Sequence, residues 1–324
     1  MKALVVSDVS QDLSGVALVD VPEPLDKPGK VLIRVKAAAL NFPDLLMTKG
    51  EYQLKPPLPF SPGMEVAGEV IAGVGFEGGE AVVAGTRLGG FAQVVSVDAG
   101  AVRAKPAHLS FGEAAGVGAA YLTAYVALVR LAKVEPGEWV LVHGATGGVG
   151  LAAVDLAKAL GAKVIATSRS ADKLRIVEAE YGVEAALPAT GFREQVKELT
   201  GANGGKGGAD VIYDPVGGDV FDESVRAIAF GGRLCVIGFT SGRIATVSTN
   251  MPLIKGFSVI GVRAGEYGRQ FPEKGRENQD AIWRLVEEGR IRPRVHAEYP
   301  LEDWRAAFDA MARSDMVGKI VLVP

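Results

Sequence analysis

Hydrophobic and polar positions alternate in short runs along the first third of the chain. MKALVV (1–6), KVLIRVKA (30–37), EVAGEVIA (65–72) and GFAQVVSV (90–97) follow this pattern, with glycines between them. A period of two is typical of strands with one buried face. Many short strands punctuated by turn residues predict a small β-barrel or sandwich at the N-terminus.

From about residue 113 the pattern changes to helices that alternate with short apolar strands. Strands are predicted at 139–142, 163–168, 210–214 and 233–238, and helices at 171–181, 192–200 and 219–230. This alternation predicts a parallel α/β sheet. The last part adds strands at 258–262 and 319–323 and helices at 278–288 and 301–313, the second with Trp304, Ala307, Phe308 and Met311 on one face.

The stretch WVLVHGATGGVG (139–150) joins an apolar run to three glycines at three-residue spacing. Glycine permits a tight turn and a close approach of phosphate, and the N-terminus of the following helix binds anions. The spacing is GxxGxxG rather than GxGxxG, so a glycine-rich turn without a ligand is the alternative. KVIATS (163–168) completes a βαβ unit, which favours a dinucleotide site. The expected cofactor-binding residues of the turn are Gly144, Thr146, Gly147, Gly148 and Val149.

The end of the second strand predicts which nucleotide is bound. An NAD site places Asp or Glu here for the ribose 2′-hydroxyl, but this chain has SRSADK (168–173). A carboxylate would repel a 2′-phosphate, whereas Ser168, Arg169 and Lys173 supply donors and positive charge. We therefore expect NADPH rather than NADH. The alternative is a surface arginine beside Ser170, which would only cap the helix at 171–181.

Ligands of open α/β sheets bind outside the carboxyl ends of the strands. Val216 and Gly217 follow one predicted strand, and Gly238 and Phe239 follow the next. These four residues are therefore expected neighbours of the cofactor. Asp155 and Lys158, three residues apart in the intervening helix, are expected on its exposed face.

Composition narrows the function classes. The 324 residues suggest two domains, and a net charge of −3 provides no basic footprint for nucleic acid. The single cysteine, Cys235, lies in a predicted buried strand and cannot form an internal disulfide, so a cytoplasmic protein is expected. His108, His143 and His296 are widely separated and no CxxC pair occurs, so a zinc site is not expected. The apolar stretch at 114–129 is too short for a typical membrane span.

The order of these regions indicates a doubly wound Rossmann domain inserted into a β-rich domain. We expect the β-rich domain at 1–118 and 258–324 and the Rossmann domain at 119–257. The cleft between two such domains would be the natural active site.

Several segments make the family recognisable. The chain resembles the zinc-free quinone oxidoreductases, the zeta-crystallin-like branch of the medium-chain dehydrogenase/reductase superfamily. The landmarks are AALNFPDLLMTKGEY (38–52), LPFSPGMEVAGEV (58–70), AYLTAY (120–125), GATGGVG (144–150), DPVGG (214–218) and GKIVLVP (318–324). Zinc-dependent relatives carry a Cys near Asn41 and a His where this chain has Met64. The resemblance implies a GroES-like catalytic domain and a homodimer joined through Rossmann edge strands, with 258–262 near the seam.

The resemblance also implies roles for individual residues. Asn41 and Tyr52 are the expected catalytic residues: Asn41 is an amide near the nicotinamide that also contacts the cofactor, and Tyr52 is a pocket tyrosine. The alternatives are a turn-forming asparagine and a half-buried aromatic side chain. Thr123 is implied to lie beside the nicotinamide, and Glu65 matches the acid beside the zinc ligand in metal-using relatives. Some relatives clamp the 2′-phosphate with a tyrosine, but the corresponding stretch here, AALPATG (185–191), has none. Arg169 is therefore expected to bind the 2′-phosphate in its place.

The resulting expectation is a cytoplasmic, NADPH-dependent, zinc-independent quinone oxidoreductase that acts on a small molecule and binds neither nucleic acid nor membrane. Reduction of α,β-unsaturated carbonyls, including enoyl thioesters, needs similar electrostatics and stays open. A nonenzymatic NADPH-binding protein is the third alternative. Arg263, Glu266 and Tyr267 continue the predicted cleft without an assigned role.

Overall fold

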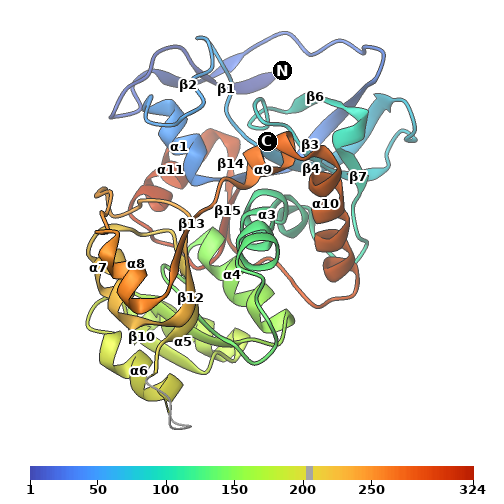
Figure 1. The fold of residues 1–324 in the computed structure, drawn as a ribbon. Helices are drawn as coiled ribbons and strands as arrows, with labels where there is room; N and C mark the ends of the chain where they lie inside the picture. The colour runs from blue at the N-terminus through green and yellow to red at the C-terminus, as the bar shows by residue number, and fades with distance from the viewer. Residues whose placement is uncertain (202–206) are drawn as a thin grey trace. The chain divides into compact units, whose positions relative to one another are not determined.

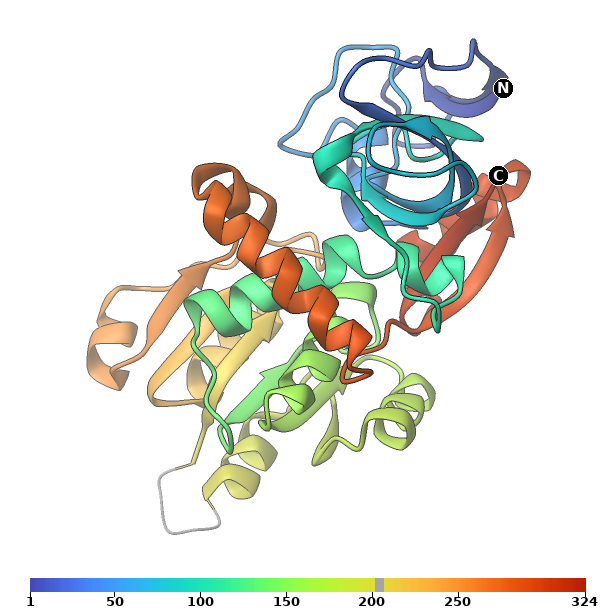
Figure 2. The same cartoon turned by 90° about the vertical axis from the view of Figure 1, so that its right-hand side faces the viewer.

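The computed structural model describes residues 1–201 and 207–324. The chain forms two compact units (Figures 1 and 2). Residues Met1–Ala119 and Pro293–Pro324 make the first, called the β unit here, and Ala120–Arg292 make the second, the α/β unit. None of the described helices is long and apolar enough to cross a bilayer.

The unit boundaries differ from those expected at 118/119 and 257/258. The first moves by one residue, and the second moves to 292/293. The reason is the strand β13 (Ser258–Gly261), which pairs in parallel with β12 (Ile228–Val236) and so extends the α/β sheet. The chain therefore leaves this unit only after Arg292.

The β unit is built on β3 (Lys30–Leu40), a strand long enough to have three partners. It pairs antiparallel with β4, β6 and β15, and its register shifts at two places along β4. Such irregularities bend a strand and increase its twist. Among the described residues the sheet has the order β14-β15-β3-β4-β5-β7, with β6 on β3, and β1 and β2 form a separate pair.

The other elements of this unit have the following bounds: β1 Lys2–Val6, β2 Val16–Asp20, α1 Phe42–Thr48, β4 Glu65–Gly73, β5 Ala81–Gly85, β6 Val94–Asp98, η1 Ala99–Ala101, β7 Val102–Ala104, α2 Phe111–Ala115, β14 Val295–Pro300, η3 Leu301–Asp303, α11 Trp304–Ala312 and β15 Lys319–Val323. The helix α3 (Gly118–Tyr125) begins at the end of this unit and continues into the next.

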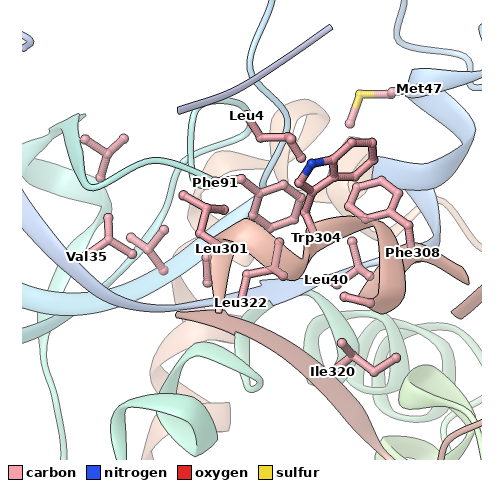
Figure 3. Close-up of a cluster of buried hydrophobic side chains, with 14 of the residues drawn as sticks. Leu4, Val35, Leu40, Met47, Phe91, Leu301, Trp304, Phe308, Ile320 and Leu322 are labelled. Carbon is pink, nitrogen blue, oxygen red and sulfur yellow. The ribbon is translucent and has the colours of Figure 1, made fainter. Parts of the chain in front are cut away.

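The core of the β unit gathers side chains from both ends of the chain (Figure 3). Phe308 on α11 meets Phe91 and Trp304 edge-on, with ring centroids 6.1 and 5.7 Å apart. This is a favoured geometry for aromatic pairs. Trp304, Ala307, Phe308 and Met311 are all buried, as their helical spacing predicts. The C-terminal return is therefore an integral part of the N-terminal domain.

The α/β unit contains one parallel sheet in the order β10-β9-β8-β11-β12-β13. Counted from β8, this is the order 3-2-1-4-5-6 of a doubly wound dinucleotide-binding fold. The order reverses between β8 and β11, so their carboxyl ends mark the place where such sheets bind ligands. Leu141, Ile165, Ile212 and Leu234 on the central strands are fully buried, as expected for strands covered on both faces.

The elements of this unit have the following bounds: a π-helical segment Val126–Leu131, β8 Trp139–Val142, α4 Gly148–Ala159, β9 Lys163–Ser168, α5 Ala171–Tyr181, β10 Ala185–Pro188, α6 Arg193–Gly201, β11 Ala209–Asp214, α7 Gly218–Ala227, β12 Ile228–Val236, α8 Asn250–Lys255, β13 Ser258–Gly261, α9 Ala264–Gln270 and α10 Pro272–Glu287. Most predicted elements lie within a few residues of these bounds. The helix predicted at 219–230 ends three residues early, because Ile228 already begins β12. The helix predicted at 278–288 begins six residues early, with a proline in its first turn.

Candidate functional site

The turn between β8 and α4 needs two of its three glycines for its own geometry. Gly144 has a φ of +55°, which L side chains rarely adopt. A Cβ on Gly150 would lie 2.2 Å from the carbonyl oxygen of Gly144, so the helix can approach the turn only without a side chain there. A Cβ on Gly147 would meet, among the described atoms, only that same oxygen at an ordinary 3.4 Å. Gly147 is therefore not required by packing within the chain.

The N-terminus of α4 has the chemistry that an anion needs. Gly147 is the N-cap residue and supplies no side-chain acceptor for the first N–H groups of the helix. These groups and the helix dipole favour a negatively charged ligand. Gly148 and Val149 lie in the first turn. The sequence, the φ of Gly144 and the bare cap together fit a dinucleotide pyrophosphate.

His143, directly before this turn, is a fully buried structural link. Its Nδ1 and Nε2 lie 2.8 Å from the Thr167 and Ser224 hydroxyl oxygens. Because Ser224 donates its proton to the Val220 carbonyl at 2.7 Å, it accepts from the Nε2–H of His143. Burial lowers the pKa of His143 to about 3, so the ring is neutral at pH 7. His143 thus joins β8, β9 and α7, and sequence reasoning assigned it no role.

The end of β9 brings together two of the predicted cofactor residues. Thr146 from the glycine turn and Ser168 from β9 are buried, with their hydroxyl oxygens 3.2 Å apart. Ser170 caps α5 by accepting from the Lys173 N–H at 3.3 Å, as the alternative interpretation of this segment predicted. Arg169 is exposed between these two serines. Ser170 therefore caps α5, and the neighbouring Arg169 is exposed at the end of β9.

The carboxyl ends of β11 and β12 meet the glycine turn. A Cβ on Gly144 would touch Pro215 and Val216, each at 3.4 Å, and one on Gly217 would touch Phe239 at 3.0 Å. Gly238 lies beside the Pro215 carbonyl. Val216, Gly217, Gly238 and Phe239 therefore gather near Gly144, and their contact with the cofactor stays a prediction. Thr123 lies in a different element, α3, three residues before a π-helical segment of the kind often found near functional sites.

Asp214 holds the backbone at the end of β11. Its Oδ1 accepts the N–H groups of Val216 and Gly217 at 2.8 and 2.9 Å, and burial raises its pKa. Its Oδ2 is buried and has no hydrogen-bond partner within the described residues. Asp214 therefore stabilises the backbone of the DPVGG turn through buried hydrogen bonds and presents no exposed charge.

In the β unit, Asn41 belongs to a buried polar network. Its Nδ2 donates to Glu65 Oε1 at 2.9 Å and to the Ala39 carbonyl at 3.2 Å. Its Oδ1 accepts from Lys319 Nζ at 2.7 Å, and the same ammonium lies 3.0 Å from Glu65 Oε1. Glu65 Oε2 accepts the Ala119 N–H at 2.7 Å. Asn41, Glu65 and Lys319 are 6%, 4% and 5% exposed, so the network is nearly closed to water.

Asp44 holds the backbone on which Asn41 lies. Its carboxylate accepts the N–H groups of Asn41 at 2.9 Å and Gly63 at 3.0 Å, completing the capping box of α1. Burial raises the pKa of Asp44 to about 7, against the two hydrogen bonds that favour its charged form. Sequence reasoning missed Asp44 and Lys319. The available signal was a lysine at the start of an otherwise apolar strand, KIVLV (319–323).

Tyr52 is half-buried, and its ring packs against the core of the β unit. Within the described part of the chain its hydroxyl makes no hydrogen bond, so it keeps both its donor and its acceptor capacity.

Arg263, Glu266 and Tyr267, left without a role by the sequence, lie at or within α9. Glu266 accepts from Arg269 at 2.8 Å and from Gln270 at 2.7 Å, so its charge is already paired on the helix surface.

The described part of the chain assembles no ligand set typical of zinc. Residues 1–201 and 207–324 contain no group of three or more His, Cys, Asp or Glu side chains that could hold a metal ion. Burial raises the pKa of Cys235 to about 12, so its thiol is protonated at pH 7 and is neither a nucleophile nor a ready metal ligand.

Two family models match the chain: an alcohol dehydrogenase GroES-like domain over residues 27–128 and a zinc-binding dehydrogenase over 148–278. Bovine quinone oxidoreductase-like protein 2 is 36% identical over 307 residues, which cover 93% of this chain and 86% of that protein. Among solved structures, the quinone oxidoreductase of Thermus thermophilus, described alone and in complex with NADPH, is 33% identical with a TM-score of 0.88, and all of both chains is covered. The enoyl reductase CurK is 25% identical with a TM-score of 0.88, covering 99% of this chain and 98% of its own.

Proposed function

Because the chain belongs to the quinone oxidoreductase branch of the medium-chain dehydrogenase/reductase superfamily, we propose that it is an NADPH-dependent, zinc-independent reductase of quinones. The observation that carries the proposal is the glycine turn followed by Ser168 and Arg169, with no carboxylate at the end of β9. The name of the Thermus thermophilus structure, a quinone oxidoreductase in complex with NADPH, supports the same cofactor.

In this proposal the α/β unit holds NADPH. The first turn of α4 binds the pyrophosphate, while Ser168, Arg169 and Lys173 bind the 2′-phosphate through charge-assisted hydrogen bonds. Val216, Gly238, Phe239 and Thr123 contact the rest of the cofactor. The bound cofactor would supply a hydride. The protein's own contribution is to position the reactants, exclude water and stabilise developing negative charge.

We assign the acceptor side of the reaction to the β unit. The Tyr52 hydroxyl, with no partner in the described chain, is the proposed donor to the oxygen that gains negative charge. Asn41 contributes a rigid amide toward the nicotinamide. A Tyr52→Phe enzyme is expected to lose most of its turnover with its NADPH affinity unchanged; unaltered turnover would remove Tyr52 from this role.

Zinc independence rests on the chemistry of the available side chains. The resemblance implies that zinc-dependent relatives carry a Cys near Asn41 and a His at the position of Met64, and neither Asn41 nor Met64 provides a thiolate or an imidazole. Glu65 is instead paired with the ammonium of Lys319. The network therefore already contains a cation of its own. The single Cys235, buried and reduced, is consistent with the cytoplasmic location that we also propose.

Reduction of α,β-unsaturated carbonyls is the second candidate, favoured by the fold match to CurK, an enoyl reductase. Both reactions place negative charge on a carbonyl oxygen, so one donor serves either. The deciding experiment follows NADPH oxidation against quinones, enones and enoyl thioesters, with NADH in parallel and metal content measured on the same sample. Oxidation with quinones alone supports the first function, and oxidation with enoyl thioesters alone supports the second. Tight NADPH binding without oxidation of any acceptor would indicate a nonenzymatic binding protein.

We also propose a homodimer through the edge of the α/β sheet. β13 is the edge strand in the described sheet, and an exposed strand edge can pair with another chain. An apolar patch surrounds it: Phe230, Leu253, Ile254 and Val259 are 88%, 82%, 72% and 39% exposed. This edge patch supports association with a second copy.

A further inference from the structure

Lys319 is a buried cation to which the proposed function gives no part in the reaction. It begins β15, is 5% exposed, and directs its ammonium at Asn41 Oδ1 and Glu65 Oε1. Removing an ammonium and a carboxylate from water is costly even when the two are paired. An apolar pair of similar size would often pack as well. The presence of these charges therefore points to a task beyond holding the fold together.

The network gives the Asn41 amide a single orientation. Lysine can only donate, and a carboxylate can only accept. In the observed orientation Oδ1 faces the ammonium and Nδ2 faces the carboxylate. Turning the amide over would place its N–H groups against the ammonium and its oxygen against the carboxylate, which replaces two attractive contacts by two repulsive ones.

This orientation also limits what Asn41 can offer to a ligand. Both protons of Nδ2 are used, one by Glu65 and one by the Ala39 carbonyl. A carbonyl oxygen has two acceptor directions, and Lys319 takes one of those on Oδ1. The remaining direction can only accept. The group that meets Asn41 must therefore be a hydrogen-bond donor, such as a carboxamide NH₂ or a hydroxyl, and not a developing oxyanion.

We propose that Lys319 is a positioning residue that fixes Asn41 as a hydrogen-bond acceptor toward the nicotinamide side of the bound cofactor. The inference rests on the proposed function, because it takes Asn41 to be the amide beside the nicotinamide. It assigns stabilisation of the oxyanion to another donor, for which Tyr52 is the choice made above. A purely structural ion pair would instead connect β15 and β4 without affecting turnover of the folded enzyme.

The test compares Lys319→Met with Lys319→Arg and with the double variant Glu65→Gln/Lys319→Met. The double variant removes the Glu65 carboxylate together with the Lys319 ammonium, so neither is left buried without the other, which protects the fold, yet it still lacks the cation on Asn41. Lys105→Met is the matched control, since Lys105 also bonds through its ammonium inside the β unit, to the carbonyls of Pro106 and Leu109. Steady-state turnover with NADPH and a quinone is measured for each variant that melts cooperatively.

We expect Lys319→Met and the double variant to lose about tenfold to a hundredfold in kcat, as misplacement of a positioned group does. Lys319→Arg should recover part of this loss, and Lys105→Met should turn over as the unsubstituted protein does. In an Asn41→Ala background, adding Lys319→Met should cause no further loss, because Lys319 acts through Asn41. A folded double variant with unchanged kcat would overturn the inference, and so would equal, additive losses in both backgrounds.

A second readout separates this inference from the proposed function. The side-chain amide protons of Asn41 can be followed by ¹H–¹⁵N NMR in the apo protein. They should exchange with water at least tenfold faster in the double variant than in the unsubstituted protein, and Lys105→Met should leave them unchanged. Unchanged exchange in the double variant would refute the positioning role even if no acceptor is reduced. Absence of NADPH oxidation in the unsubstituted protein would refute only the proposed function.

Discussion

Tyr121 and Asp155 form a short hydrogen bond inside the α/β unit, with 2.5 Å between the phenol oxygen and Asp155 Oδ2. The same carboxylate oxygen accepts the backbone N–H of Arg292 at 2.8 Å. Tyr121 lies next to the first residue of this unit, and Arg292 is its last. A single oxygen on α4 thus anchors both ends of the unit, although the helical pattern had placed Asp155 on an exposed face.

This carboxylate should make stability depend on pH. Burial raises the pKa of Asp155 from 3.8 to about 6, while the bonds from Tyr121 and Arg292 oppose the shift. Between pH 3.8 and 6 the folded protein therefore binds more protons than the unfolded chain, so the free energy of unfolding falls as pH rises through this window. The loss amounts to at most about 3 kcal/mol and is complete above about pH 6.

Asp155→Asn is the variant that isolates this effect. The amide oxygen can accept both hydrogen bonds, and the NH₂ group replaces the other carboxylate oxygen. Denaturant unfolding from about pH 4 to about pH 8 should show Asp155→Asn gaining stability relative to the unsubstituted protein up to about pH 6 and then holding that gain. Asp172→Asn, at a solvent-exposed carboxylate of the same unit, should show no such trend. Parallel pH profiles for Asp155→Asn and the unsubstituted protein would contradict the prediction.

Substitutions at two glycines of the turn between β8 and α4 should affect folding and cofactor binding separately. In Gly150→Ala the new Cβ would lie 2.2 Å from the Gly144 carbonyl oxygen, so the helix must shift. We expect it to lose about 1–3 kcal/mol of stability, as overpacked sites do. In Gly147→Ala the Cβ meets only an ordinary contact inside the protein. It should melt like the unsubstituted protein yet bind NADPH at least tenfold more weakly, because the methyl group occupies the approach of the pyrophosphate.

Differential scanning calorimetry and NADPH fluorescence titration measure the two effects. Gly182→Ala is a control for loss of glycine alone: it lies in the α/β unit at the left-handed cap of α5, in open space. It should lose stability without losing NADPH affinity. If Gly147→Ala bound NADPH normally, the turn could not be the pyrophosphate site.

Local signals explain why much of the α/β unit could be predicted from the sequence. β9 and α5 have the predicted bounds, because β-branched residues fill the strand while Ser170 and the left-handed Gly182 cap the helix. β14 was not predicted. It is an edge strand with alternating exposure and a terminal proline, and its only partner in the described sheet, β15, lies about twenty residues further along the chain. β13 was predicted, but its assignment to the α/β unit depends on pairing with β12, which no local pattern reveals.

The candidate site likewise has one part that the sequence could identify and one part that only the fold reveals. The glycine turn and the serines of 168–170 are contiguous motifs, so the sequence could identify them. The network around Asn41 joins residues 24 and 278 positions away from it. Each member has an ordinary local explanation, as a turn residue, a strand glutamate or a strand lysine. Only the fold brings the three side chains together and shows that the Asn41 amide protons are already used.

Arg169 should determine the preference for NADPH over NADH. Replacing it by aspartate removes a charge-assisted donor worth about 1.5–3 kcal/mol and adds repulsion toward a 2′-phosphate. We expect Arg169→Asp to bind NADPH at least tenfold to a hundredfold more weakly, with its affinity for NADH nearly unchanged.

Isothermal titration with both cofactors checks this prediction, and the NADPH penalty should shrink at high salt. Arg226→Asp is the charge-matched control. Arg226 lies in the last turn of α7, which leads to the amino end of β12 and thus to the opposite edge of the sheet from the proposed site. An unchanged ratio of NADPH to NADH affinity in Arg169→Asp would show that the 2′-phosphate lies elsewhere.

The edge patch makes the proposed dimer testable. Phe230 packs beside the end of α8, where Gly231 N–H donates to the Gly256 carbonyl at 2.7 Å, so Phe230, Leu253 and Ile254 share one surface next to β13. A charge buried in an interface without a partner is strongly unfavourable. Leu253→Glu combined with Val259→Glu should therefore convert a dimer to a monomer at micromolar concentration, with near-native secondary structure, as measured by analytical ultracentrifugation. Val74→Glu is the control, because Val74 is 70% exposed and belongs to the β unit rather than to the sheet that ends at β13. A monomeric unsubstituted protein would refute the dimer, and a double variant that still sediments as a dimer would place the interface on another surface.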